Sequence, residues 1–384
     1  MPYNIGIDAR KLGQPGIGHY IRRLVSGLAE IDEDNLYSLF VGSLYDGEFE
    51  DLPENFVCVS ESSPVYSFRE RVALSWRQLR RRLDIYHATH YILPLLLPRR
   101  TVTTVHDVLH LLYPDFMPGR LSMYVAPTQI RRTLARSNHI IAESQNTRAD
   151  LVDYFDLRPG KISQIYPGVD MAFTPEAAPD DEGIRQALGL DKPYVLFRGD
   201  SRRHKNEEIT LRAFAAATAS GATDLELVCL GEHEASGERF AQFARALDLE
   251  GRFRWIDAPP AEHIPSLLRG AKLFLYPTLY EGFPMPVIES MACGLPVITA
   301  NNATLREVAE GSAKLVDASS VASLAGAIGW CLNDGQLTAN LAADGLKRAE
   351  VFRWRRVALQ TLEVYESVLA DGDGDAKVTQ EVEA

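Results

Sequence analysis

Short runs of apolar, mostly β-branched residues alternate along the chain with longer segments in which apolar residues recur every three or four positions. The runs predict strands and the longer segments predict amphipathic helices, an alternation typical of parallel sheets with crossover helices. In the first half the predicted strands are YNIGID, YSLFVG, FVCVS, IYHATH, TVTTVHD, HIIAES and ISQIYPG. The clearest helices between them cover residues 18–30, 68–83, 121–136 and 147–155.

The alternation pauses at residues 171–183, which are rich in Pro, Gly and acids and predict a linker. It then starts again, with YVLFRGD, LELVCLG, FRWID, LFLYPT, PVITAN and AKLVD as strands. We therefore expect an α/β protein with two Rossmann-like domains, residues 1–170 and 184–353. Ligands of such sheets bind at the carboxyl ends of strands, so we expect the site in a cleft where the two edges face each other. A last helix covers 354–370, and the tail 371–384 is predicted to be disordered.

Composition is typical of a globular protein, with 46% hydrophobic and 24% charged residues. No uncharged apolar run approaches the roughly 20 residues that span a bilayer. The N-terminus lacks a basic region followed by a long apolar segment, so no signal peptide is expected. Four cysteines lack the spacing of a metal site or of a disulfide framework, which favours reduced thiols in a cytoplasmic protein.

Charge is unevenly distributed along the chain. The net charge of −12 argues against a nucleic-acid partner. Residues 62–170 nevertheless hold 15 basic against 9 acidic residues, with arginines concentrated in the predicted helix 68–83. The apolar face of this helix consists of Val72, Trp76, Leu79 and Leu83. It either rests on an anionic membrane surface or packs on a sheet while the arginines face water.

Three glycines, Gly13, Gly16 and Gly18, separate the first predicted strand from the first helix. Glycines in this position let backbone amides approach a phosphate, although a plain strand-to-helix turn has the same composition. Their spacing is not G-x-G-x-x-G, and the second strand ends without the acid that holds an NAD ribose. A nicotinamide-dependent dehydrogenase is therefore disfavoured.

The second half opens with a strand that runs into a basic loop, FRGDSRRHKNEE. The planar fork of an arginine and the point charge of a lysine together suit a diphosphate. A solvated basic turn is the alternative, but the loop follows the carboxyl end of a strand, where ligands bind. The candidate ligands are Arg198, Arg202, Arg203 and Lys205.

The segment EGFPMPVIES places Glu281 on a loop and Glu289 within the helix that follows it. Pro286 suits the first helical turn, since its missing N–H has no intrahelical partner there. Met285 and Val287 are then placed to present backbone amides to an anion at the helix start. One carboxylate would meet a sugar on one side of that anion, and the other a ribose on the far side. A nucleoside diphosphate sugar has this layout.

This segment resembles the E-x7-E motif of retaining glycosyltransferases with the GT-B fold, especially glycosyltransferase family 4 (glycosyl transferases group 1). Further similar motifs follow in order: GIDARKLGQPGIGHYIRRL, DIYHATHYILPL, TVTTVHDVLHLLYP, ESQNTRADL, KISQIYPGVD and RRHKN. The resemblance implies that Lys205 and Arg202 bind the donor diphosphate, although Arg198 and Arg203 stay open as alternatives. The other donor-binding residues that it implies are Gly16, Gly282, Phe283, Met285, Val287 and Glu289. It makes Glu281 and His106 the catalytic residues, and it returns the last helix to the first domain.

The resemblance also implies retention at the anomeric carbon, with no metal and no cofactor besides the nucleotide sugar. The HKN and TVHDVLHLLYP segments resemble those of mannosyltransferases that use GDP-mannose. The implied acceptor is a glycan or lipid-linked saccharide of cell-surface polysaccharide synthesis, reached from the cytoplasm or from the inner membrane face. A sugar phosphorylase or synthase with the same motif is one alternative. A catalytically silent, membrane-associated scaffold is another, and it would be recognised by loss of Lys205, Glu281 or Glu289, all of which are present.

Overall fold

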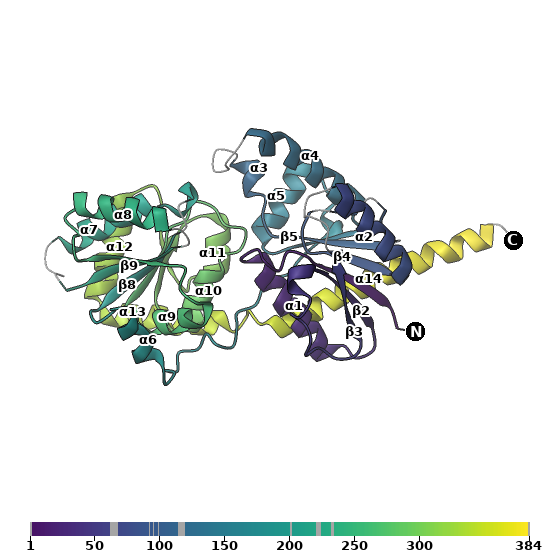
Figure 1. The fold of residues 1–384 in the computed structure, drawn as a ribbon. Helices are drawn as coiled ribbons and strands as arrows, with labels where there is room; N and C mark the ends of the chain where they lie inside the picture. The colour runs from purple at the N-terminus through teal and green to yellow at the C-terminus, as the bar shows by residue number, and fades with distance from the viewer. Residues whose placement is uncertain are drawn as a thin grey trace. The chain divides into compact units, whose positions relative to one another are not determined.

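The chain folds into two compact units, each of which is described here by itself (Figure 1). The computed structural model describes residues 2–382 except 62–67, 92, 95, 99, 114–119, 200–201, 220–223 and 232–233. Unit 1 consists of Met1–Gly168 together with Arg353–Ala384, and unit 2 of Val169–Phe352.

Unit 1 contains a parallel sheet of seven strands in the order β3-β2-β1-β4-β5-β6-β7. All seven strands predicted for the first half are confirmed. Their bounds are β1 (Asn4–Ala9), β2 (Leu36–Gly42), β3 (Phe56–Glu61), β4 (Ile85–Ala88), β5 (Arg100–Val105), β6 (His139–Ala142) and β7 (Ile162–Gln164). Because the strand order reverses between β1 and β4, the crevice at their carboxyl ends is the topological switch point of this sheet.

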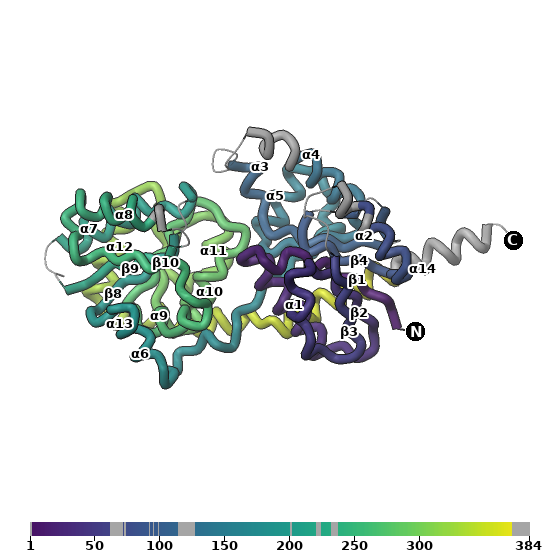
Figure 2. Tube along the Cα trace, in the orientation of Figure 1, coloured from purple at the N-terminus to yellow at the C-terminus, as the bar shows by residue number. Residues whose placement is uncertain are grey.

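The helices of unit 1 include all four that the sequence predicts. Their bounds are α1 (Ile17–Ile31), α2 (Phe68–Arg81), α3 (Leu109–Leu112), α4 (Arg120–Arg136), α5 (Gln145–Phe155) and α14 (Trp354–Val382). Helix α14 lies beside α1 although more than three hundred residues separate them in the chain (Figure 2). The packing is close: a Cβ on Gly27 would lie 3.0 Å from the Cβ of Ala358, tighter than most real Cβ contacts, so a side chain here would push the two helices slightly apart. The last helix therefore belongs to unit 1.

Helix α14 is assigned as far as Val382. The disorder that the composition of residues 371–384 predicted stays a prediction.

Unit 2 contains a parallel sheet of six strands in the order β10-β9-β8-β11-β12-β13. The six predicted strands are confirmed as β8 (Tyr194–Arg198), β9 (Glu226–Gly231), β10 (Phe253–Asp257), β11 (Leu273–Tyr276), β12 (Val297–Ala300) and β13 (Lys314–Val316). The helices are α6 (Asp181–Ala187), α7 (Glu207–Thr218), α8 (Glu234–Ala246), α9 (Ile264–Gly270), α10 (Met285–Ala292), α11 (Ala303–Ala309), α12 (Val321–Asn333) and α13 (Gly335–Ala349). The order reverses between β8 and β11, which makes their carboxyl ends the switch point of this sheet.

Residues 171–183 lie within unit 2 rather than between the units. Helix α6 begins at Asp181, and this carboxylate is buried against the guanidinium of Arg269 on α9. An acid-rich, Pro-rich composition predicted a linker because it contains few apolar residues. In the structure, polar contacts attach the segment to unit 2 instead.

Helix α2 exposes most of its predicted apolar face to solvent. Val72, Trp76 and Leu79 are 46%, 54% and 60% exposed, and only Leu83 is buried. The side chains of residues 68–71 and 73 lie outside the described part. For these three residues, the interpretation that the face packs on a sheet is therefore wrong. No helix in the described part of the chain is both long and apolar enough to cross a membrane.

Candidate active site

The switch point of unit 2 is lined by polar side chains from two loops. Strand β8 ends at Arg198 and leads into a short 3₁₀ turn, Arg203–Lys205, and then into α7. Strand β11 ends at Tyr276 and leads through a Pro- and Gly-rich loop into α10. Since β8 and β11 are neighbours in the sheet, the two loops emerge side by side.

Lys205, Tyr276 and Glu281 form a closed triangle of hydrogen bonds. The Nζ atom of Lys205 donates to Glu281 Oε1 and to Tyr276 Oη, both at 3.0 Å, and Tyr276 Oη lies 3.0 Å from the same Glu281 oxygen. Burial, reinforced by the Glu281 charge, raises the pKa of Tyr276 well above its usual value, while Lys205 opposes this shift. The phenol therefore stays protonated. The triangle holds an ammonium group in place before any ligand arrives.

Arg198 and Glu289 form a second, looser pair beside this triangle. Arg198 Nη1 lies 3.7 Å from Glu289 Oε2, and Glu289 is buried on α10. Burial raises the pKa of Glu289, and the charge of Arg198 opposes that shift. Arg198 is thus in contact with a predicted site residue. Arg202 is exposed and immediately precedes the 3₁₀ turn, and its predicted role toward the diphosphate stays a prediction.

The start of α10 differs from what the sequence led us to expect. Pro284 is the N-cap and Pro286 stands in the first turn, as predicted, but the N–H groups of Met285 and Val287 already donate to nearby carbonyls. Met285 N lies 3.1 Å from Phe283 O, and Val287 N lies 2.9 Å from Pro284 O. An anion at this helix start would have to share or replace those bonds.

The side chains around these amides serve packing. Val287 is fully buried, Gly282 is buried, and the ring of Phe283 meets Phe352 edge to face at 5.7 Å. Their predicted donor contacts would therefore have to come from backbone or from ring edges.

Asn206 fixes the basic loop to the rest of the edge. Its backbone is left-handed (φ 66°), a conformation that Asn tolerates better than most residues. Its side-chain Nδ2 donates to the carbonyls of Pro277 at 3.0 Å and Ala318 at 2.6 Å. Leu279 N also donates to His204 O at 2.8 Å. The loop that carries Lys205 is therefore tied to the loop that carries Glu281.

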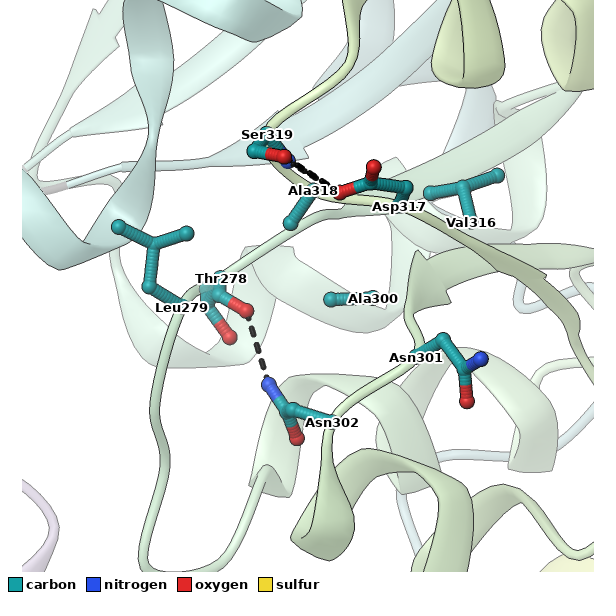
Figure 3. Close-up of a pocket in the computed structure, with 9 residues that line it drawn as sticks. All are labelled: Thr278, Leu279, Ala300, Asn301, Asn302, Val316, Asp317, Ala318 and Ser319. Carbon is teal, nitrogen blue, oxygen red and sulfur yellow. Dashed lines mark hydrogen bonds between the residues drawn. The ribbon is translucent and has the colours of Figure 1, made fainter.

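A cavity of about 350 Å³ opens next to these loops, at the carboxyl ends of β11, β12 and β13 (Figure 3). Its lining residues are Thr278, Leu279, Ala300, Asn301, Asn302, Val316, Asp317, Ala318 and Ser319. Asn302 donates to the carbonyl of Thr278, and Ser319 donates to Asp317 across its rim (Figure 3). Among the lining residues that the structure describes, Asp317 is the charged one. A wall without a cation among these residues does not suit a diphosphate, so the predicted phosphate contacts stay with the Lys205 side of the loop.

His106 lies at the carboxyl edge of the other sheet, just after β5 in unit 1, with both ring nitrogens engaged. Nδ1 lies 2.6 Å from Glu143 Oε1, and Nε2 lies 2.9 Å from the carbonyl oxygen of Thr89. A carbonyl only accepts, and an ionised carboxylate only accepts, so both nitrogens carry protons when Glu143 is charged. Burial alone would lower the pKa of His106, but the charge and hydrogen bond of Glu143 and the Thr89 carbonyl outweigh it and raise the pKa. The predicted contact with a donor sugar stays a prediction, and it requires Nε2 to leave Thr89.

Gly16 is the N-cap of α1, with φ at +67° and open space where a side chain would point. Its positive φ explains why glycine stands here. The open space is compatible with a ligand close to the backbone, although the predicted diphosphate contact is untested.

The pair of His106 and Glu143 predicts a specific pH dependence of stability. Because the folded-state pKa is raised above the usual 6.5, the pair stabilises unit 1 below that pH. The contribution is lost as pH rises through the folded-state pKa. At low pH, Glu143→Gln should therefore have a lower free energy of unfolding than the natural protein, by about 1.4 kcal/mol per unit of pKa shift. At high pH the two free energies should converge.

Urea unfolding between about pH 5 and pH 9 measures this difference. Asp153→Asn on the exposed side of α5 is the matched control and should show a constant offset. An equally constant offset for Glu143→Gln would show that His106 is not charged in the folded state.

In the part of the chain that the structure describes, no group of three or more His, Cys, Asp or Glu residues is placed so that it could hold a metal ion. The loop between β8 and α7 carries the cationic side chains Arg202, Arg203 and Lys205, and Arg198 ends β8.

Two family profiles match the chain in succession. The profile of Glycosyltransferase Family 4 matches residues 16–173, and that of Glycosyl transferases group 1 matches residues 180–348. Among curated proteins, O-antigen chain mannosyltransferase B of Escherichia coli is 26% identical over 91% of this chain and 95% of its own length. The D-inositol 3-phosphate glycosyltransferase of Salinispora tropica is 30% identical, and the match covers 62% of this chain but about half (53%) of that protein.

Solved structures agree with the fold. Sucrose-phosphate synthase from Thermosynechococcus elongatus superposes with a TM-score of 0.77 at 20% identity, covering 96% of this chain and all of that one. HepE from Anabaena, solved with UDP and glucose, gives a TM-score of 0.74 at 20% identity, covering 95% and 100% of the two chains. The two parallel sheets, the E-x7-E segment on the second sheet and these matches lead to one conclusion: the chain is a glycosyltransferase of the GT-B fold and belongs to glycosyltransferase family 4.

Proposed function

We propose that this protein is a retaining, metal-independent glycosyltransferase that moves a hexose from a nucleoside diphosphate sugar to a glycan or lipid-linked saccharide. The observation that carries the proposal is the triangle of Lys205, Tyr276 and Glu281 at the switch point of unit 2. It brings a fixed cation and a carboxylate together, as binding of a diphosphate and of an adjacent sugar requires.

Mannose is the hexose that we favour, with GDP-mannose as donor in cell-surface polysaccharide synthesis. Support comes from the relative whose match covers 91% of this chain, which is named an O-antigen chain mannosyltransferase. The competing base is uracil, because HepE was solved with UDP. The two donors differ in both base and sugar, so one panel of nucleotide sugars distinguishes them.

In the proposed mechanism, Lys205 shifts from Glu281 toward the diphosphate as charge develops on the leaving group. Arg198 or Arg202 supplies the second positive contact, and no metal ion is needed to neutralise the phosphates. Glu281, released from Lys205, accepts hydrogen bonds from hydroxyls of the transferred sugar, and Glu289 accepts them from the ribose. The acceptor hydroxyl attacks from the face of the departing diphosphate and gives its proton to that phosphate, which accounts for retention.

The proposal is tested by nucleotide release from GDP-mannose, UDP-glucose, UDP-N-acetylglucosamine, UDP-galactose and ADP-glucose, with EDTA present throughout. Release from GDP-mannose above the other donors, lost in Lys205→Ala, is the expected result. Dependence on added Mg²⁺ would overturn metal independence. Phosphate-driven breakdown of a disaccharide would favour the phosphorylase alternative. No release and no donor binding by calorimetry would favour the silent scaffold.

We also propose that α2 contacts the inner face of a membrane while the enzyme works on a lipid-linked acceptor. The support is the exposed apolar face formed by Val72, Trp76 and Leu79. The guanidinium of Arg80 lies over the Trp76 ring, 3.5 Å from the ring centroid. An apolar stripe bordered by arginines matches the acyl chains and the anionic headgroups of such a surface.

Removing this apolar face should release the protein from vesicles. The double variant Trp76→Gln/Leu79→Gln should bind phosphatidylglycerol-containing vesicles at least about tenfold less tightly, since one buried side chain of this size contributes about 1.5–3 kcal/mol. Co-sedimentation measures the change, with pure phosphatidylcholine vesicles as the uncharged comparison. Leu44→Gln, at a residue 91% exposed in the same unit, is the matched control. Equal binding by the double variant and the control would refute a membrane role for α2.

A further inference from the structure

The switch point of unit 1 has a polar residue that neither the donor chemistry nor the sheet packing uses. Strand β4 ends at Ala88, and the residue after next, His90, follows the carboxyl end of this strand next to β1. Thr89 Oγ1 donates to the carbonyl of Asp8 at 2.6 Å, which fixes the β4 end against the β1 end. By the general rule for open parallel sheets, this crevice is where a ligand of unit 1 binds.

The ring of His90 is only 7% exposed, and its Nδ1 atom is buried with no hydrogen-bond partner among the described residues. Tyr91 packs against this ring at 3.7 Å and extends toward His110 at 5.4 Å, centroid to centroid. The Nε2 atom of His110 is likewise buried and has no partner within the described part of unit 1. Buried polar atoms nearly always have partners, so these two ring nitrogens at a switch point are candidates for contact with a ligand.

The electrostatic surroundings keep His90 neutral. Burial, followed by the charges of Lys11, His106 and His110, lowers the pKa of His90 to about 3, and Asp8 opposes this only in part. A neutral imidazole nitrogen donates or accepts according to its tautomer. A hydroxyl group does both, so it pairs with either tautomer. A phosphate or carboxylate oxygen only accepts, so it pairs with Nδ1 in one tautomer alone. A metal ion would be repelled by the ammonium of Lys11.

We propose that Nδ1 of His90 binds a hydroxyl group of the saccharide acceptor, in a subsite formed by the ends of β1 and β4. The proposal rests on the proposed transferase function and adds where and by which group the acceptor is recognised. The ligand is a neutral, hydroxyl-rich sugar ring rather than a phosphate. His110, across Tyr91, is placed to contact a second hydroxyl of the same ring.

Imidazole NMR tests the contact directly. The protein is labelled with ¹⁵N at its nine histidines, and His90→Asn identifies the His90 signals. Octyl glycosides of mannose, glucose, galactose and N-acetylglucosamine serve as acceptor probes. At least one glycoside is expected to shift the Nδ1 resonance of His90, while methyl phosphate does not. A shift with methyl phosphate alone, or with no probe at all, would overturn the inference.

Kinetics with the glycoside that acts as acceptor provide the second test. His90→Leu should lower kcat/KM for the acceptor about tenfold, as expected for one lost hydrogen bond to a buried group. His90→Asn keeps a polar atom near the Nδ1 position and should recover most of that loss. Donor affinity is measured by calorimetry in parallel. Two results would show that His90 acts through folding and not by acceptor contact. One is a loss of donor binding that accompanies the loss of kcat/KM for the acceptor. The other is an equal loss of that kcat/KM in His90→Leu and His90→Asn.

The two tests separate this inference from the proposed function. If the natural protein binds no nucleotide sugar, the proposed function fails, yet the histidine spectra still report whether a glycoside reaches His90. If donors bind and release nucleotide while no glycoside shifts His90, the transferase stands and only the acceptor subsite is wrong.

Discussion

Replacing Lys205 with alanine is expected to lower kcat with the productive donor by about 10²–10³, equivalent to about 2.7–4 kcal/mol of transition-state stabilisation. The Nζ atom of Lys205 is held 3.0 Å from both Glu281 and Tyr276, and its side chain is largely buried. Water therefore screens this ammonium weakly, so it stabilises a developing negative charge strongly once it has shifted from Glu281. Single-turnover and steady-state nucleotide release measure kcat and KM separately.

The split between the two constants distinguishes roles for Lys205. Equal losses in kcat and kcat/KM would place its contact in the transition state, whereas a higher KM at constant kcat would make it a uniform binding residue. Lys347→Ala, at a side chain 78% exposed on α13, is the matched control and should leave both constants unchanged. A Lys205→Ala enzyme with both natural kcat and natural KM would remove Lys205 from the proposed mechanism.

The fold followed from the sequence wherever buried strands carry β-branched runs. TVTTV lies wholly in the buried strand β5, and PVITAN contains β12. One boundary error is at IYHATH, where the strand ends at Ala88, before Thr89 and His90. Thr89 bonds through its side chain to Asp8, and this contact depends on a residue eighty-one positions away. No local pattern could have shown where the strand stops.

The candidate site was predictable in part. Lys205, Glu281 and Glu289 were identified from charge placed after predicted strands and from the E-x7-E resemblance. Tyr276 was missed because a tyrosine within LFLY has the pattern of a core aromatic residue, and only its hydroxyl contacts reveal its place in the triangle. Glu143 was missed as the partner of His106 because the pair joins the ends of two different strands.

The two amides at the start of α10 illustrate a different limit. The sequence correctly placed Pro286 in the first turn, but it could not show that Met285 and Val287 donate within that turn. The residue types predict where a helix begins. Whether a backbone N–H at that point already has an acceptor depends on the local backbone path. This is why charged side chains, and not these amides, carry the proposed diphosphate contact.

Removing the carboxylate of Asp181 is expected to lower the free energy of unfolding by about 3–5 kcal/mol, because the change leaves the charge of Arg269 buried and unpaired. Arg269 binds Asp181 through two nitrogens, at 2.5 and 2.7 Å, and Ser266 donates to the same carboxylate at 2.6 Å. Arg269 also reaches the carbonyl of Thr174, so the pair attaches the segment before α6 to α9. Asp181→Asn keeps the shape but removes the charge and one of the two accepting oxygens, and urea unfolding measures the loss.

The matched control is the neighbouring Glu182→Gln, which breaks a largely solvated pair with Arg185 and should cost no more than about 1 kcal/mol. The hydrogen bond from Arg269 is the main reason why the pKa of Asp181 lies below its usual 3.8. The stability that this group contributes is therefore present above pH 3.8 and is lost as pH falls through the lower, folded-state pKa. The double variant Asp181→Leu/Arg269→Met should be more stable than Asp181→Asn, since it buries no unpaired charge. If instead Asp181→Asn and Glu182→Gln unfold at the same urea concentration, the buried pair does not hold α6 on unit 2, and residues 171–183 behave as the linker that their composition predicted.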